Sequence, residues 1–249
     1  MFRRLRQSWG RKQALSKHFY RRFTEKYFAH DVNFELQMMA RHDAALYIRQ
    51  NMPGANMYAD RWRLLAAAVD AAPRQGMVLE FGVEKGASAN FIAGRIAGRG
   101  DGAVVDAFDS FEGLPESWHG TYETRGKFNL DGRVPRLLPN VRVHRGWFDA
   151  TLPGFRQAAE ATRIALLHID CDIYSSTRTV FDNVGDLLRP GSIVVFDEYF
   201  NYHGWELHEF KAWGEFVSAR RVKYTYRGFC GQGGQVFLRI DEMGGEGAG

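Results

Sequence analysis

The 249-residue chain has the composition of a globular protein, with 45% hydrophobic and 25% charged residues. This length suits one α/β domain with an extension better than two full domains. The apolar runs fall short of the ~20 residues that span a bilayer, and the N-terminus lacks an apolar signal-peptide core. The two cysteines, Cys171 and Cys230, do not have metal-site spacing. We therefore expect a reduced, cytoplasmic protein without a membrane span.

Positive charge is concentrated at the start of the chain. The formal net charge is only +4, yet residues 1–28 contain nine Lys and Arg residues against one acid, Glu25. Such a segment could bind nucleic acid or an anionic membrane, and it loosely resembles an Arg-rich transit peptide. We favour a solvated helical arm that packs against the domain or a second subunit. This interpretation predicts a homo-oligomer formed through the extension and no nucleic-acid partner.

From Met77 onward, strand-like apolar runs alternate with helix-like stretches, as in a parallel sheet. The expected strands are residues 77–81, 103–108, 141–144, 164–169 and 192–196. The expected helices are residues 88–98, 176–188 and 206–217. Residues 164–169 are almost continuously apolar, which is typical of a central strand covered on both faces.

The end of the chain predicts a hairpin. The runs 222–226 and 235–240 are joined by a Gly-rich link, which is too short for a parallel crossover. We therefore predict an α/β fold, a Rossmann-like doubly wound sheet of about seven strands, mostly parallel with a C-terminal antiparallel hairpin. Residues 1–58 are expected to form a basic helical extension and lid, and residues 244–249 a flexible tail.

The turn after the first strand has the residues of a ligand-binding loop. In open parallel sheets, ligands bind beyond the carboxyl ends of the strands, where the strand order reverses. The first strand leads into Glu80-Phe81-Gly82-Val83-Glu84-Lys85-Gly86-Ala87-Ser88. Gly82 and Gly86 allow a close ligand approach, and the helix start with Ser88 can face a carboxylate. Glu80 stands where a dinucleotide fingerprint has glycine, and it suits a cationic amine better than a pyrophosphate. A tight turn without ligand would explain these residues equally well.

The next two strand ends add polar and aromatic residues. Asp109 and Ser110 follow the second strand, where Rossmann-type sites hold ribose hydroxyls, although an Asp that caps a turn is an alternative. Gly146, Trp147 and Phe148 follow the third strand and could flank an adenine or belong to the core. Each signal is weak alone, but three at successive strand ends predict a nucleoside cofactor.

Three segments together resemble the macrocin O-methyltransferase family. They are residues 109–115 (DSFEGLP), 146–153 (GWFDATLP) and 169–177 (IDCDIYSST). The resemblance covers roughly residues 77–213. It implies an S-adenosylmethionine (SAM)-dependent methyltransferase, and we assign residues 59–243 to this domain. The predicted cofactor contacts are Glu80, Phe81, Gly82, Gly86, Ser88, Asp109, Ser110, Gly146, Trp147, Phe148 and Asp170. The resemblance also implies a divalent metal, usually magnesium, and a small hydroxylated acceptor such as a macrolide or aminocoumarin sugar.

Carboxylates follow the fourth and fifth strands. Asp170 ends the fourth strand, and Asp197 and Glu198 end the fifth. Neighbouring parallel strands would bring them together, and a hard cation would relieve their repulsion. Such a cation could also lower the pKa of an acceptor hydroxyl and orient its oxygen toward the methyl group. We predict these three residues as metal ligands and Asp170 also as a cofactor contact and general base.

Two features complicate the metal prediction. Proteins of the resembling family usually carry Asp-Asp-Tyr where this chain has Asp197-Glu198-Tyr199, and the octahedral geometry of magnesium tolerates such a shift poorly. Acids that bond SAM directly or cap helices are therefore the alternative. His203 in the next loop could accept a proton, or it could be a surface histidine without a role. His168 is expected in the core, and the loop 116–139 over the site.

The leading prediction is a metal-assisted O-methyltransferase of natural-product biosynthesis. Three other functions stay open. A metal-independent N- or O-methyltransferase would use the same cofactor residues. A nicotinamide oxidoreductase is disfavoured because the Gly-x-Gly-x-x-Gly turn is missing. A non-catalytic nucleotide-binding module would dock through the basic N-terminus.

Overall fold

The computed structural model describes residues 22, 24–25, 28–100, 102–159 and 162–244. The chain divides into two compact units, residues 1–39 and 40–249. In the first unit, the rings of Phe28 and Phe34 stack with centroids 4.4 Å apart, at the start of helix α2 (Val32–Asn51). Most of the basic arm predicted for residues 1–28, and all but the first residue of the predicted tail, lie outside the described residues.

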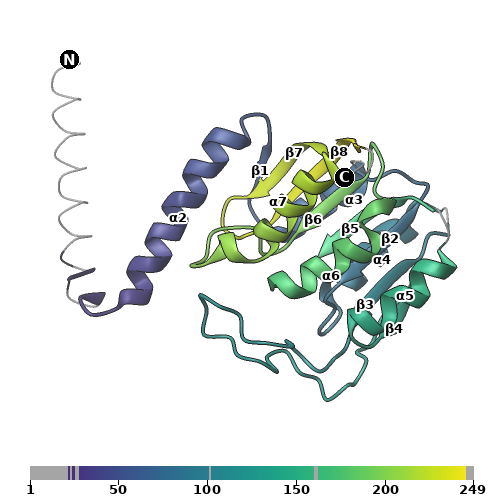
Figure 1. The fold of residues 1–249 in the computed structure, drawn as a ribbon, viewed down its shortest axis with the longest axis horizontal. Helices are drawn as coiled ribbons and strands as arrows, with labels where there is room; N and C mark the ends of the chain where they lie inside the picture. Colours follow the sequence, from purple (N-terminus) through teal and green to yellow (C-terminus); the bar gives the residue numbers. More distant parts are fainter. Residues whose placement is uncertain (1–21, 23, 26–27, 101, 160–161, 245–249) are drawn as a thin grey trace. The chain divides into compact units, whose positions relative to one another are not determined.

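The second unit is built on one eight-stranded sheet in the order β1-β7-β8-β6-β5-β2-β3-β4 (Figure 1). The strands are β1 (Asn56–Tyr58), β2 (Met77–Phe81), β3 (Val105–Asp109), β4 (Val141–Arg145), β5 (Ile164–Ile169), β6 (Ile193–Phe196), β7 (Lys223–Cys230) and β8 (Val236–Glu242). Strand β8 pairs antiparallel with β6 and β7, and the other neighbours pair in parallel. The predicted doubly wound sheet with a C-terminal hairpin is confirmed, with one strand more than expected.

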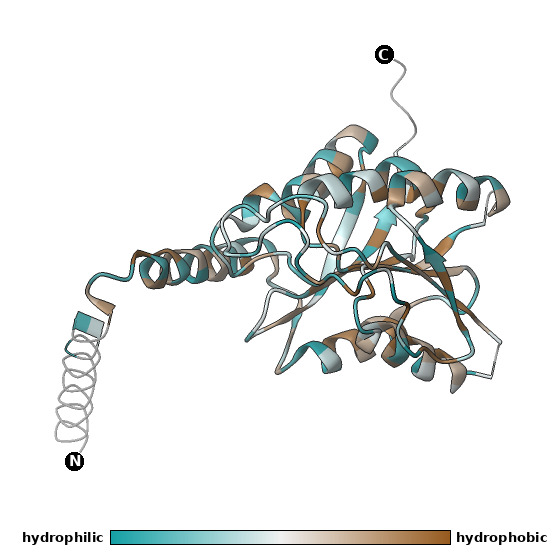
Figure 2. Ribbon diagram, turned by 90° about the horizontal axis from the view of Figure 1, so that it is seen from below, coloured by the Kyte–Doolittle hydropathy of each residue, from teal (hydrophilic) through white to brown (hydrophobic). Residues whose placement is uncertain are grey.

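Helices cover both faces of this sheet, as Figure 2 shows in side view. Helices α3 (Arg61–Ala71) and α4 (Ala87–Ala97) pack together on one face, and α5 (Phe148–Ala158), α6 (Tyr174–Val184) and α7 (Glu209–Arg220) on the other. Two short 3-10 helices, η1 (Gly185–Leu187) and η2 (Trp205–Leu207), flank these elements. No helix among the described residues is long and apolar enough to cross a membrane.

The core lies between the sheet and its helices. Strand β5 is buried over its whole length, as its apolar sequence predicts. On one face, Leu64 of α3 packs with Ile92 of α4; on the other, Phe181 of α6 lies 6.2 Å from Phe196 of β6. Burying each such side chain contributes about 1.5–3 kcal/mol. This packing holds the carboxyl ends of the central strands at fixed positions.

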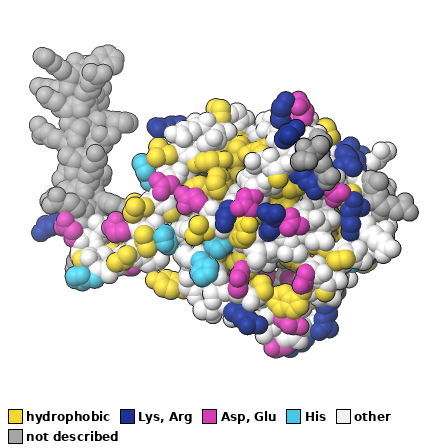
Figure 3. All heavy atoms as spheres, in the orientation of Figure 1, with side chains coloured by type: hydrophobic (Ala, Val, Ile, Leu, Met, Phe, Trp, Pro, Cys, Tyr) yellow, Lys and Arg dark blue, Asp and Glu magenta, His cyan; other side chains and the backbone are white. Residues whose placement is uncertain are grey.

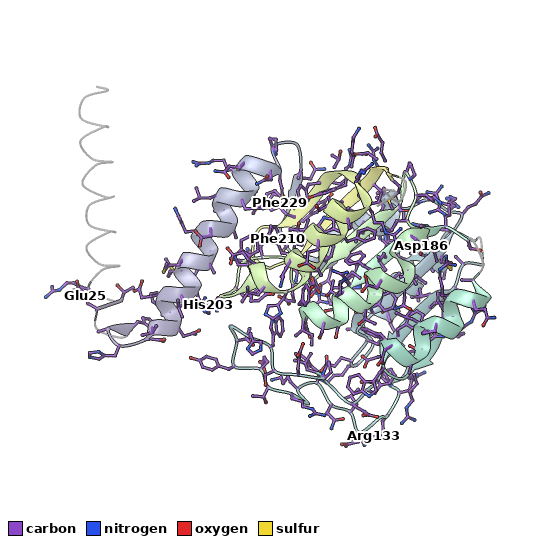
Figure 4. The ribbon with its side chains drawn as sticks, viewed as in Figure 1. Glu25, Arg133, Asp186, His203, Phe210 and Phe229 are labelled. Carbon is purple, nitrogen blue, oxygen red and sulfur yellow. The ribbon has the colours of Figure 1, made fainter. Side chains whose placement is uncertain are left out.

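Residues 52–58 end the segment 1–58, which we expected to form an extension and lid. Residues 56–58 form strand β1, which pairs with β7 so that Met57 lies opposite Phe229, labelled in Figure 4. Just before it, in the part of α2 that belongs to the second unit, the Tyr47 and Tyr226 hydroxyls are 2.7 Å apart. The segment therefore extends the edge of the sheet. Over the second unit in Figure 3, acidic, basic and apolar side chains are interspersed.

Candidate active site

A cavity of about 550 Å³ opens beyond the carboxyl ends of strands β2 to β6. It is centred where the strand order reverses, between β2 and β5, which is the usual ligand position in such sheets. The loop between β3 and β4 contributes Leu114, Trp118 and Phe128 to its wall. Size and position are typical of a small-molecule site.

The turn after β2 brings two strand ends into direct contact. Gly82 has φ +92°, and a Cβ atom there would lie 1.7 Å from the carbonyl oxygen of Asp170. On the same edge, the Asp170 N–H donates to the Phe81 carbonyl (2.8 Å). Glycine is therefore required at position 82 because the tips of β2 and β5 leave no space for a side chain. Gly82 and Ser88, both predicted cofactor contacts, line the cavity.

Asp109 fastens the turn after β2 to the end of β3. Its Oδ2 atom accepts the N–H groups of Val83 (2.7 Å) and Glu84 (2.9 Å), and Oδ1 accepts the Phe111 N–H (2.7 Å). Each carboxylate oxygen has two lone pairs, so Oδ1 keeps one for a ligand. Asp109 and its neighbour Ser110 both line the cavity.

Three predicted cofactor contacts lie behind the cavity wall. Glu80 is fully buried, and Phe81 stacks on Phe108 with ring centroids 4.7 Å apart. Gly86 is buried against the β3–β4 loop, since a Cβ atom there would lie 2.4 Å from Leu137. None of the three belongs to the described residues that line the cavity. They support the site from below instead of facing a ligand.

The end of β4 presents aromatic surface to the cavity. Gly146, Trp147 and Phe148 all line it, as predicted. Trp147 is 37% exposed and stands at the N-cap of α5. The edge of Phe148 packs on Phe81, with ring centroids 5.3 Å apart. Trp147 thus offers a free ring face, whereas Phe148 belongs partly to the core.

The predicted carboxylates meet at the other end of the cavity, together with an arginine that the sequence did not indicate. Asp170, Asp197 and Glu198 all line it. Arg61 places Nη2 3.5 Å from Asp170 Oδ2 and Nη1 3.4 Å from Asp197 Oδ2. Among the described lining residues, Arg61 is the sole Lys or Arg side chain. It is the first residue of α3, after the N-cap Asp60.

The single charge of Arg61 does not balance these three acids. Burial, and then the charge of Asp197, raise the pKa of Asp170 to about 8. Burial, followed by Asp197 and Asp170, raises the pKa of Glu198 to about 8 as well. Clustered carboxylate oxygens are the ligands that magnesium prefers, so the residues present fit a divalent cation.

A buried carboxylate–histidine pair lies beneath the cluster. Glu80 Oε1 is 2.9 Å from His168 Nδ1, and His168 Nε2 is 4.0 Å from Asp197 Oδ1. Glu80, His168 and Asp170 also offer potential metal-ligand atoms within 4.8 Å of one another. Because Glu80 and His168 bond each other, we interpret them as a support for the aspartates. The register places Glu80 directly opposite His168, a pairing that the sequence alone did not indicate.

His203, the second predicted catalytic residue, is not brought to the cavity. It lies between β6 and α7 (Figure 4), half-buried, and is not among the described lining residues. The same segment is tied to the β3–β4 loop, because His208 Nε2 lies 2.8 Å from the His119 carbonyl. Arg133, also labelled in Figure 4, lies on the outer part of that loop. Asp172 lines the cavity with φ +66°.

Comparison with known proteins identifies the central part of the chain. Residues 79–199 match a family model described as a methyltransferase domain. This segment is a methyltransferase domain. It includes the strand ends that carry Asp109, Trp147, Asp170 and Asp197, so most of the cavity wall lies within it; Arg61 and Trp62 precede it. The predicted resemblance to natural-product O-methyltransferases of the macrocin type is confirmed by the relatives.

Two curated relatives overlap the methyltransferase domain. One, from Streptomyces olivaceus, is the 8-demethyl-8-(2,3-dimethoxy-alpha-L-rhamnosyl)-tetracenomycin-C 4'-O-methyltransferase, 32% identical over 50% of this chain and 53% of its own. The other, the mycinamicin III 3''-O-methyltransferase of Micromonospora griseorubida, is 28% identical over 54% of this chain and 61% of its own. The match therefore spans little more than half the length of these relatives.

Solved structures share the fold of the methyltransferase domain. The calicheamicin methyltransferase CalS11 aligns with a TM-score of 0.55 and 23% identity, over 72% of this chain and 76% of its own. The O-methyltransferase NovP aligns with a TM-score of 0.53 and 21% identity, over 73% and 80%. At this identity the likeness describes architecture alone.

Proposed function

We propose that the protein is a SAM-dependent O-methyltransferase that methylates a hydroxyl of a sugar-bearing or related small natural product, assisted by a divalent cation. One observation carries this proposal: a single cavity joins the turn held by Asp109 to the carboxylates of Asp170, Asp197 and Glu198. The curated relatives are named for methylation of oxygen at a sugar position, which supports this acceptor class.

The cofactor would lie along the ends of β2, β3 and β4. The start of α4 beside Ser88 presents backbone N–H groups suited to the carboxylate of SAM. The remaining lone pair of Asp109 Oδ1 suits a ribose hydroxyl, and the exposed face of Trp147 suits the adenine. This arrangement directs the methionine end toward Asp170.

The transfer forms a carbon–oxygen bond to the acceptor while the bond from the methyl carbon to the sulfonium sulfur breaks. S-adenosylhomocysteine and a methyl ether result, and the hydroxyl proton passes to Asp170. Asp170 lines the cavity, where its ionised form can accept this proton. Asp170, Asp197 and Glu198 would hold Mg²⁺, which supplies Lewis acidity to the acceptor hydroxyl.

Metal-independent transfer is the second candidate, because Arg61 already contacts both aspartates. In this version the guanidinium compensates the acids, and proximity with Asp170 as base supplies the catalysis.

The proposed function is tested first by calorimetric titration of the protein with SAM and with NAD. We expect SAM to bind and NAD not to bind. Transfer of a labelled methyl group from SAM to a panel of glycosylated, hydroxylated acceptors then tests the reaction. Binding of NAD without SAM, or methylation of amines alone, would contradict it.

We also propose that the domain extends over residues 59–243 and that residues 1–58 mediate a homo-oligomer. Light scattering measures the particle mass of the full chain, which is compared with that of a chain beginning at residue 29. Equal masses per particle, after correction for the deleted residues, would argue against a role for the basic arm.

A further inference from the structure

We propose that Arg61 is a resident counter-ion that competes with the divalent cation for Asp170 and Asp197, and so sets how tightly the site binds metal. This inference rests on the metal-assisted form of the proposed function. It assigns a role to the one cationic side chain of the described cavity wall.

The guanidinium lies between the two aspartates. Its two terminal nitrogens contact different carboxylates: Nη2 lies 3.5 Å from Asp170 Oδ2, and Nη1 lies 3.4 Å from Asp197 Oδ2. Charge-assisted hydrogen bonds usually measure about 2.7–2.9 Å, so both contacts are longer than a typical bond of this kind. The buried Nε atom has no hydrogen-bond partner among the described residues. Arg61 thus neutralises the pair by proximity and is not locked into a bidentate bond.

The side chain is partly exposed and also contacts an aromatic ring. It is 37% exposed, and its guanidinium carbon lies 5.0 Å from the centroid of the Trp62 ring. Trp62 is itself 38% exposed and lines the same cavity. An arginine stacked on an aromatic face at a cavity mouth keeps a favourable contact when its ion pairs are lost.

Charge repulsion makes the guanidinium weaken the binding of a divalent cation. The oxygen atoms that face Arg61 are Oδ2 of both aspartates, so a cation held by these two carboxylates would lie close to the guanidinium. Magnesium binds oxygen at about 2.0–2.1 Å, which would place it roughly 5 Å from the guanidinium. Even with the dielectric constant of water, a double and a single positive charge at that separation weaken binding by about tenfold. Removal of the Arg61 charge should therefore strengthen metal binding.

The test measures binding of Mn²⁺ to the full-length protein with saturating S-adenosylhomocysteine, using the electron paramagnetic resonance signal of free Mn²⁺. Arg61→Gln keeps most of the side-chain shape without its charge, and Arg61→Ala removes both. We expect both variants to bind Mn²⁺ about tenfold more tightly than the wild type, and Arg61→Lys to stay close to it. Asp170→Asn should abolish the tight binding, which assigns it to this site.

Arg63→Ala is the matched control. Arg63 lies two residues further along α3, is 72% exposed in its side chain and pairs with Asp60. Its removal should leave Mn²⁺ affinity unchanged. A gain equal to that of Arg61→Gln would overturn the proposal, because it would reflect net charge alone.

Other outcomes separate this inference from the proposed function. Circular dichroism, with the wild type as reference, shows whether each variant is folded. Unchanged or weaker Mn²⁺ binding in Arg61→Gln and Arg61→Ala overturns the proposed competition. Loss of S-adenosylhomocysteine affinity with constant Mn²⁺ affinity also overturns it, because that result would make Arg61 a cofactor contact. Absence of Mn²⁺ binding from every protein that binds S-adenosylhomocysteine also overturns it but leaves SAM-dependent transfer standing. Failure of the wild type to bind S-adenosylhomocysteine would overturn the proposed function itself.

Discussion

The Val83 N–H donates to Asp109 Oδ2 at 2.7 Å, across 26 residues of chain. This bond, with those from Glu84 and Phe111, makes one carboxylate the fastening between two strand ends. Its removal is therefore a stability experiment as well as a binding experiment.

For Asp109→Ala we expect a loss of about 3 kcal/mol in the free energy of unfolding, because buried N–H groups lose their acceptor at about 1–3 kcal/mol each. Because each kcal/mol of lost stability lowers the melting temperature by about 2–4 °C, calorimetry should show a clearly lower melting temperature. Asp109→Asn, which keeps one acceptor oxygen, should fall between the wild type and Asp109→Ala. An unchanged melting temperature in Asp109→Ala would show that these bonds do not stabilise the turn.

Trp147→Ala should weaken SAM binding about tenfold, since stacking of a base on an aromatic ring contributes about 1–3 kcal/mol. Titration calorimetry measures the affinity. Tyr122, 81% exposed in the β3–β4 loop and absent from the cavity wall, provides the control as Tyr122→Ala. If both variants bind SAM as the wild type does, the adenine lies elsewhere.

Asp170→Asn should lower kcat by at least about 100-fold, the range of a lost general base. The variant should still bind S-adenosylhomocysteine, because the cofactor turn held by Asp109 is intact. Asp182→Asn, at an exposed position on α6, is the control for a neutral substitution. Full activity of Asp170→Asn on any hydroxylated acceptor would exclude the proposed base.

Chelation separates the two forms of the reaction. We expect a chelator to reduce methyl transfer at least tenfold and Mg²⁺ to restore it, because the acceptor hydroxyl loses its Lewis acid. The assay is run at fixed SAM and acceptor, with S-adenosylhomocysteine formation as readout. Full activity after chelation would favour the metal-independent version.

Glu209 predicts a pH dependence of stability. This glutamate is fully buried, and burial, followed by Asp172 and Glu198, raises its pKa well above the ordinary 4.5. The folded state therefore retains a proton that the unfolded chain releases above about pH 4.5, so this group lowers stability as pH rises toward its folded pKa.

In the wild type the Glu198 N–H donates to Glu209 Oε2 at 3.1 Å. Glu209→Gln keeps an oxygen acceptor for this N–H and removes the cost of ionising a buried carboxyl. We expect its melting temperature to match the wild type near pH 4 and to exceed it by a few degrees at pH 7. A difference that is constant with pH would show that Glu209 is not protonated in the folded state.

The strand pattern could be predicted where burial dictates composition, and the misses have physical causes. Residues 164–169 are apolar because both faces of β5 are covered, and the predicted range matches the strand. Helix α5 escaped prediction because Pro153 and Gly154 lie inside it and usually signal a break. Strand β1 has three residues and exists through its pairing with β7, a tertiary contact that local sequence does not reveal.

The site shows the same division. Residues after strand ends could be found because parallel strands converge at one edge, and Asp109, Trp147 and Asp170 all line the cavity. Arg61 was missed because it starts a helix, where nothing in the sequence tells which way α3 points. Glu80 is predicted as a cofactor contact from its residue type, and local sequence does not reveal the β2–β5 register that places it opposite His168.

The backbone contact at Gly82 has a consequence for how such a protein can diversify. With no room for even one carbon atom between the tips of β2 and β5, the spacing from the turn after β2 to Asp170 is set by main-chain atoms. Substitutions in the β3–β4 loop can reshape the wall around Trp118 and Phe128 without altering that spacing. Selection for a new acceptor should therefore act on the loop and leave the floor of the cavity unchanged.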